Sequence, residues 1–208
     1  MRIIAIQHTE SEHHINKMVG SWTDWSLTKS GLITAERIAD NLVSNFSFEN
    51  DLIVSSDLLR CSCIAEILKK KTQCEMQIIK ELRGKNYGAA CGHSDEWLEK
   101  NRNPYPIFDA RDVEYRYVED AENTVELYQR MEGVFRKWLE NGRNIIYVAH
   151  GDALNVFYAW WLDIPVLQLQ RSDLFSSSGS VSEFYTLSDS KRLAIRIGDM
   201  SFALENRI

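Results

Sequence analysis

Three short apolar runs divide the chain and predict buried β-strands. Each run is rich in Ile and Val, and together they occupy residues 3–6, 52–54 and 145–148. Unbroken apolar runs of this length are typical of strands that are covered on both faces of a sheet. Each run changes abruptly to polar residues at its C-terminal end.

Four other segments carry apolar residues at helical spacing and therefore predict helices. They are residues 32–42, 58–68, 125–139 and 153–161. Asn123 with Glu126 three residues later is a variant of the capping box, so the third helix is expected to start there. Thr28 or Ser30 is expected to cap the first helix.

The order of these elements predicts the fold. Strands that alternate with helices indicate an α/β protein, here a three-layer α/β/α sandwich with a mainly parallel central sheet. Residues 181–187 and 193–197 flank a polar Ser188-Asp189-Ser190 turn and predict a hairpin or an edge pair. Residues 84–120 interrupt the alternation, and we expect them to form an inserted cap over the site within one domain spanning residues 1–208.

Composition and charge narrow the functional classes. A net charge of −6 argues against a nucleic-acid partner. No apolar stretch approaches the roughly 18 residues of a membrane span, and the first strand begins at residue 3, so we expect a cytoplasmic protein without a membrane partner. The four cysteines are irregularly spaced and are expected to be reduced thiols rather than a disulfide framework or a metal site. Nothing in the sequence indicates the oligomeric state.

The polar ends of the three strands carry the candidate chemistry. His8 follows the first strand, Arg60 follows the second by a few residues, and His150 follows the third. Because ligands of open α/β sheets bind at the carboxyl ends of the strands, these side chains are expected to meet at one edge. A neutral imidazole is a competent nucleophile near pH 7, and a guanidinium can hold two phosphoryl oxygens. Each residue alone is more often structural, but the three together indicate a phosphate site.

The same residues carry a family resemblance. Residues 7–10, Gln-His-Thr-Glu, look like the Arg-His-Gly-Glu signature of the histidine phosphatase superfamily, which includes the cofactor-dependent phosphoglycerate mutases. Residues 55–60 are close to the Ser-Ser-Asp-Leu-x-Arg of that family, and residues 149–151 resemble its second histidine motif. Residues 22–31 resemble the segment after the signature, and residues 121–123 stand where the family often has Gly-Glu-Ser. The matching pieces run in the family's order over nearly the whole chain.

The resemblance implies roles for individual residues. It makes His8 the phosphorylated nucleophile and Arg60 and His150 phosphate-binding residues, in a phosphoglycerate mutase-like fold. We expect no cofactor. His14 stands where the mutases carry an asparagine that contacts phosphate.

Two positions depart from the family pattern. Gln7 replaces the arginine before the nucleophile, which removes a charge-assisted contact, although its amide can still donate to phosphate. Gly84 replaces the glutamate that serves as the family's acid. Asp152, two residues after His150, is our first candidate for the acid, with Glu81 and Glu10 as further candidates. Asp152 is equally suited to cap the following helix.

These observations predict a phosphomonoester hydrolase that works through a phosphohistidine at His8. A phosphoglycerate-type mutase is one alternative, and a catalytically weakened phosphate-ligand-binding protein is another. We expect no metal, because adjacent residues such as His13 and His14 usually point in different directions. The substrate is expected to be a small phosphorylated molecule, with a phosphopeptide as an alternative. Charged and aromatic residues that are candidates to select it are Arg83, Lys85, Arg102, Arg111, Tyr87, Trp97, Tyr105 and Phe108.

Overall fold

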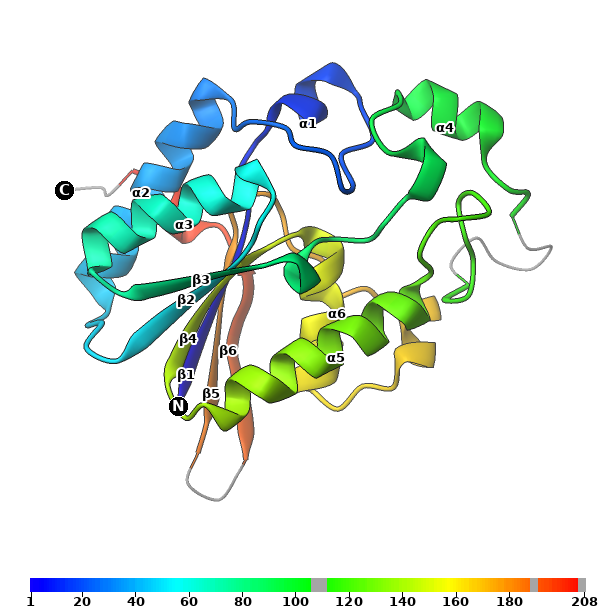
Figure 1. Ribbon diagram of the computed structural model, residues 1–208. Coiled ribbons are helices and arrows are strands. Elements are labelled where there is room, and N and C mark those ends of the chain that lie inside the picture. The colour runs from blue at the N-terminus through cyan, green and yellow to red at the C-terminus, as the bar shows by residue number, and fades with distance from the viewer. Residues whose placement is uncertain (106–111, 188–190, 206–208) are drawn as a thin grey trace.

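The computed structural model describes residues 1–105, 112–187 and 191–205. Within these ranges six strands form one sheet in the order β3-β2-β4-β1-β5-β6 (Figure 1). The strands β1 to β4 are parallel to one another, whereas β5 runs antiparallel to both β1 and β6. Their bounds are Arg2–Gln7 for β1, Asp51–Ser56 for β2, Glu75–Ile79 for β3, Asn144–Ala149 for β4, Val181–Thr186 for β5 and Arg192–Asp199 for β6.

Helices cover both faces of the sheet (Figure 1). Apolar residues of α2 and α3 pack on one face, and those of α5 and α6 pack on the other. The α-helices are α1 (Glu12–Asn16), α2 (Lys29–Asn45), α3 (Leu59–Thr72), α4 (Asp95–Asn101), α5 (Thr124–Glu140) and α6 (Gly151–Trp161). Short 3-10 turns are η1 (Lys80–Leu82), η2 (Gly88–Ala90), η3 (Val166–Gln170) and η4 (Ser201–Ala203).

The first strand shows why the apolar runs are unbroken. Its successive side chains point to opposite faces, so Ile4 and Ile6 enter the core under α2 and α3, while Ile3 and Ala5 enter the core under α5 and α6. Both cores consist of apolar side chains, and therefore these positions of the strand have to be apolar. The structure thus confirms the three-layer α/β/α sandwich with a mainly parallel sheet.

Most of the expected elements are present. The four helices and three parallel strands are confirmed, and so is the antiparallel pair β5–β6. Thr28 caps α2, and the capping box of Asn123 and Glu126 starts α5. The expected turn at residues 188–190 lies outside the described residues. The sequence analysis missed β3, an edge strand, and α1, a helix of five residues.

The register of the parallel strands places the polar positions at one edge. Gln7 of β1 pairs with Ala149 of β4, and Ser55 of β2 pairs with Val148. His8 and His150, which follow β1 and β4, and Ser56, the last residue of β2, therefore come together at the same end of the sheet. The start of α6 and the helix α1 lie at this edge (Figure 1).

The described parts of the segment 84–120, residues 84–105 and 112–120, lie outside the layered core, and the part that carries α4 passes alongside α1 (Figure 1). It contains η2 and α4, and the backbone of Val19 donates to His93 O at 2.8 Å. A small, separate apolar cluster packs this segment against Val19. It consists of Val19, Ala90, Leu98, Val118 and Ala121. Arg111 and Phe108, named above as candidates for substrate selection, lie outside the described residues.

Two expectations from composition concern the whole molecule. In the part of the chain that the structure describes, no helix combines the length and the apolar character needed to cross a membrane. The cytoplasmic location stays a prediction. All four cysteines are free thiols, in agreement with the sequence analysis.

Candidate functional site

A cavity of about 350 Å³ opens at the carboxyl ends of β1, β2 and β4. It brings together six residues singled out in the sequence, namely Gln7, His8, His14, Arg60, His150 and Asp152. The convergence of side chains from four separate stretches of sequence follows from the parallel register of the three strands.

His8 is held in one orientation and in one tautomer. Its Nδ1 lies 2.9 Å from the carbonyl oxygen of Thr9. Because a carbonyl only accepts, Nδ1 carries the proton and Nε2 keeps its lone pair. His8 is 4% exposed, and burial followed by the charge of Arg60 holds its pKa well below the usual value. The imidazole is therefore neutral at pH 7, which is the form a nucleophile requires.

His150 lies beside His8, with its ring edge toward the His8 ring and the centroids 5.2 Å apart. Its Nε2 is 2.9 Å from Ser56 Oγ. Burial, and then Arg60 and His8, hold its pKa well below the usual value, so this ring is also neutral. The neighbouring Cys61 thiol, whose Sγ is 3.4 Å from His150 Nε2, stays protonated because burial raises its pKa to about 12.

Arg60 supplies a buried positive charge. Its Nη1 donates to Thr23 O at 2.8 Å and its Nη2 to Ser21 O at 2.7 Å, and the side chain is only 2% exposed. Nε has no hydrogen-bond partner among the described residues, and no described carboxylate lies within 4.0 Å of the guanidinium. A buried cation without a counterion is costly, so this arrangement is suited to an anion that enters from the cavity.

Gln7 occupies the cavity wall without a charge. Its Oε1 accepts from Ser176 Oγ at 2.7 Å, which fixes the amide and leaves Nε2 as a donor beside Gly151. An amide can donate to a phosphoryl oxygen, but it lacks the full charge of the arginine that the sequence comparison leads one to expect.

The adjacent residues His13 and His14 do not diverge as the sequence analysis expected. Their ring centroids are 4.0 Å apart because Ser11, the N-cap of α1, holds both rings. Its Oγ is 2.8 Å from His13 Nδ1, and its backbone N–H donates to His14 Nδ1 at 3.2 Å.

This geometry bears on metal binding. His8, His13 and His14 place three potential ligand atoms within 4.8 Å of one another. However, His14 Nδ1 accepts a hydrogen bond, so the proton of the neutral ring sits on Nε2. An N–H at Nε2 is a hydrogen-bond donor, which suits an anion better than a metal ion.

Asp152 is the one of the three acid candidates from the sequence that lines the cavity, which Asp173 lines as well. The helix α6 starts at Gly151 with His150 as its N-cap, so Asp152 is the second helical residue. The interpretation of Asp152 as the capping residue is therefore wrong. Its carboxyl is open to the cavity, yet desolvation by the surrounding protein raises its pKa, and the charge of Lys85 opposes the shift.

The other two acid candidates lie elsewhere. Glu10 is exposed and accepts from Thr28 Oγ1 at 2.6 Å, and Glu81 is an exposed residue of η1. Neither side chain lines the cavity. Gly84 does line it, and a Cβ built there would lie 3.0 Å from the Cβ of His150, so the backbone at this position packs against the histidine.

The sequence analysis did not assign several lining residues to the site. Ser21, Asn155, Asp173 and Ser176 were not considered, and Lys85 and Tyr87 were named only as candidates for substrate selection. Ser21 and Ser176 belong to loops without a motif, so no sequence signal points to them. Arg83 and Arg102, in contrast, pair with Asp57 and Glu99.

A second cavity of about 510 Å³ adjoins the first and shares His13, His14, Ser21 and Tyr87 with it. Residues from the described parts of the segment 84–120 form its other wall. That wall carries two further tyrosines, Tyr105 and Tyr117, and the acidic residues Asp95 and Glu99. Trp97 stacks on His93 instead, with ring centroids 4.1 Å apart.

Comparison with known proteins adds independent findings. The model of the histidine phosphatase superfamily (branch 1) matches residues 3–195. A 2,3-bisphosphoglycerate-dependent phosphoglycerate mutase of Buchnera aphidicola is 27% identical, with 88% of this chain and 93% of the relative covered. A broad-specificity phosphatase of Saccharomyces cerevisiae is 23% identical, with 99% and 91% covered.

Solved structures share the fold. The α-ribazole phosphatase of Shigella flexneri superimposes with a TM-score of 0.83 at 20% identity, over 99% of this chain and all of that one. A mycobacterial glucosyl-3-phosphoglycerate phosphatase in complex with VO3 gives a TM-score of 0.82 at 18% identity, over 95% and 99% of the two chains.

Proposed function

Because the chain belongs to the histidine phosphatase superfamily (branch 1), we propose that it is a phosphomonoester hydrolase that works through a phosphohistidine at His8. The observation that carries the proposal is the neutral, oriented imidazole of His8 in a cavity with an unpaired, buried Arg60. A nucleophile and a counterion for a dianion in one enclosed space suit phosphoryl transfer, which depends mainly on positioning and charge stabilisation.

The first step transfers the phosphoryl group to the protein. The lone pair on His8 Nε2 forms a bond to phosphorus, and the bond from phosphorus to the ester oxygen breaks. Asp152 gives its proton to that departing oxygen, so the leaving group is an alcohol. A carboxyl with a raised pKa keeps more of the required protonated form at neutral pH.

The second step returns the protein to its starting state. Water attacks phosphorus, the carboxylate of Asp152 takes up one proton of the water, and the bond from phosphorus to Nε2 breaks. Arg60, His14 and the amide of Gln7 would donate to phosphoryl oxygens in both steps. His150 would donate from Nε2, which lies 2.9 Å from Ser56 Oγ, in the tautomer that carries its proton there.

The second cavity supports separate binding places for the two parts of the substrate. The first cavity would hold the phosphoryl group, and the second would hold the leaving group beneath the described parts of the segment 84–120, which would act as a cap within a single domain. Tyrosine rings and two carboxylates favour a small uncharged or ring-containing alcohol as the leaving group.

A phosphoglycerate-type mutase is the second candidate, because phosphoglycerate mutases are among the relatives. The walls of the second cavity argue against it. Among the described residues they carry Asp95 and Glu99 but no lysine or arginine to meet a substrate carboxylate.

Turnover of p-nitrophenyl phosphate by the purified protein tests the proposal. We expect release of phosphate in the presence of EDTA, since no step uses a metal ion, and a loss of at least about a thousandfold in the His8→Ala variant. His93→Ala, which changes an exposed histidine outside the cavity, is the matched control. Equal rates in His8→Ala and the unsubstituted protein would exclude a phosphohistidine mechanism and leave a phosphate-binding protein.

A further inference from the structure

Among the described residues, the cations that line the phosphate cavity differ in their pairing from those that lie next to its lining residue Gly84. Arg83 and Arg130 each make an ion pair with two hydrogen bonds, to Asp57 and Glu122 respectively. Neither side chain lines the cavity. Arg60 and Lys85 do line it, and no described carboxylate lies within 4.0 Å of either charge.

Lys85 is as incompletely satisfied as Arg60. Its ammonium has three donors, and the one acceptor within hydrogen-bond range among the described residues is Thr124 Oγ1 at 3.0 Å. Lys85 is partly buried, and desolvation lowers its pKa, an effect that Asp152 and Glu122 oppose. Lys85 lines the phosphate cavity and also a smaller cavity of about 180 Å³, whose wall includes Thr124 and Asp152. A partly buried charge with spare donors beside these cavities is suited to an anion.

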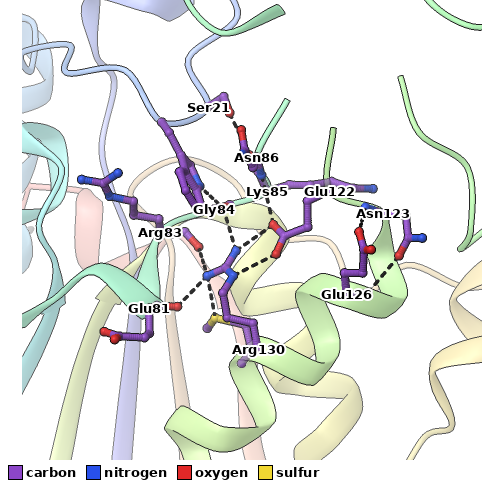
Figure 2. Close-up of polar contacts among 12 residues, drawn as sticks. Ser21, Glu81, Arg83, Gly84, Lys85, Asn86, Glu122, Asn123, Glu126 and Arg130 are labelled. Carbon is purple, nitrogen blue, oxygen red and sulfur yellow. Dashed lines mark hydrogen bonds and ion pairs between the residues drawn. The ribbon is translucent and has the colours of Figure 1, made fainter. Parts of the chain in front are cut away.

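The backbone around Lys85 is fixed on both sides (Figure 2). Arg130 donates to the carbonyl oxygens of Glu81, Arg83 and Gly84 at 2.6, 2.9 and 3.0 Å. Its partner Glu122 accepts from the backbone N–H of Asn86 at 3.0 Å. One ion pair, between Arg130 of α5 and Glu122 just before that helix, therefore holds the backbone of the turn that carries Lys85.

A second set of contacts joins this turn to the loop that holds Arg60. Ser21 Oγ donates to Lys85 O at 2.9 Å and accepts from the N–H of Tyr87, while Ser21 O accepts from Arg60. The indole of Trp22 donates to Gly84 O at 2.9 Å. Ser21 thus links the guanidinium of Arg60 to the backbone of Lys85, and the two cations come from chain segments that contact each other.

We propose that the Lys85 ammonium contacts the phosphoryl group of the substrate and supplies the positive charge that Gln7 lacks. The inference rests on the proposed function only in that the cavity holds a phosphate ester. In the family pattern the positive charge stands at the end of β1, where this chain has Gln7. Here Lys85, in the turn of residues 84–86, would supply that charge instead. Lysine is suited to this place because its compact charge on a flexible stem needs no fixed planar geometry.

Binding of orthovanadate, measured by calorimetry, tests the proposal. Losing one charge-assisted contact should weaken binding roughly ten- to a hundredfold in Lys85→Met. Lys85→Arg should retain most of the affinity. Lys100→Met, which removes the same charge from an exposed position on α4, should bind as the unsubstituted protein does. Equal affinities of Lys85→Met and Lys100→Met would overturn the proposal.

The double variant Gln7→Arg with Lys85→Met separates a direct role of the charge from a structural one. If Lys85 replaces the missing charge, an arginine at position 7 should restore at least about tenfold of the lost affinity. A structural defect in the 84–86 turn would not be repaired from β1, so a failure of this rescue in folded protein, checked by circular dichroism, would also overturn the proposal. Turnover of p-nitrophenyl phosphate by the unsubstituted protein is read separately: its absence would count against the hydrolase, while vanadate binding alone decides on Lys85.

Discussion

The rings of His8 and His150 meet edge to face, with their centroids 5.2 Å apart, deep in the same cavity. Two imidazolium ions at this separation would repel each other, and burial avoids the repulsion by keeping both rings neutral. In the proposed mechanism the pair would offer a lone pair on His8 and a hydrogen-bond donor on His150, two different functions from the same side-chain type.

Replacing His150 tests the donor half of this pair. We expect His150→Ala to lower kcat by about a hundred- to a thousandfold, the usual cost of removing one donor that stabilises a transition state. His150→Asn, which keeps a donor of smaller reach, should lose less. Steady-state kinetics with p-nitrophenyl phosphate measures both. An alanine variant with unchanged kcat would show that His150 is merely structural.

Asp152 should control the limb of the activity profile at high pH. As an acid it must be protonated, so kcat/KM should fall as pH rises through its pKa, which desolvation raises. Lys85 lowers this pKa, whereas Glu122 and Asp173 raise it. In Lys85→Met the falling limb should therefore move to higher pH, an effect that a loss of packing would not produce. If the falling limb stays at the same pH in Lys85→Met, the charge of Lys85 does not act on the pKa of Asp152.

The leaving group should also reveal Asp152. We expect Asp152→Asn to lower kcat about a hundredfold or more on an alkyl phosphate, which needs a proton on its oxygen, and much less on p-nitrophenyl phosphate. Gly84→Glu places a carboxyl beside His150 and is the natural rescue variant, although its Cβ would lie 3.0 Å from that of His150. An equal loss on both substrates in Asp152→Asn would contradict the assignment.

The ion pair of Arg130 and Glu122 should be important for stability as well as for the site. Both side chains are largely buried, at 20% and 12% exposure, so Arg130→Met strands a carboxylate and should lower the free energy of unfolding by about 3–5 kcal/mol. Arg136→Met on the same helix breaks an exposed pair and should cost no more than about 0.5 kcal/mol. Urea unfolding compares the two. Equal losses would mean that the 81–86 turn does not depend on Arg130.

The buried histidines predict how stability varies with pH. In the folded protein the pKa values of His8 and His150 lie well below 6.5, while in the unfolded chain they are near 6.5. As pH falls below about 6.5, the unfolded chain binds protons that the folded protein does not. The free energy of unfolding should therefore fall between pH 6.5 and 5, by up to about 1.4 kcal/mol per pH unit for each histidine.

Urea unfolding at pH 7.5, 6.5 and 5.5 measures this dependence. The His8→Asn variant should show a shallower slope, because one of the contributing groups is gone. A free energy of unfolding that stays constant from pH 7.5 to 5.5 would contradict the burial of neutral imidazoles.

The fold was largely predictable because both faces of the central strands are covered. Residues 3–6 and 145–148 had to be apolar throughout, and this pattern is visible in one sequence. The strand β3 was missed since it lies at the edge with mostly exposed residues. The helix α1 was missed because five residues are too few to show a period.

The site was predictable where chemistry and motif coincide. His8, Arg60 and His150 stand at strand ends or just after them, and their convergence follows from the parallel sheet. Lys85 was harder to assign, since its role depends on which neighbouring cations are already paired. Pairing of Arg83 with Asp57, 26 residues away in sequence, is a tertiary fact that no local pattern contains.

Trapping of the phosphorylated protein tests the central proposal most directly. After rapid quenching of a reaction with a labelled phosphate ester, we expect one phosphoryl group per chain, labile to acid and stable to alkali, located on His8 by mass spectrometry. Label on another residue, or no label under conditions where phosphate is being released, would contradict a phosphohistidine at His8.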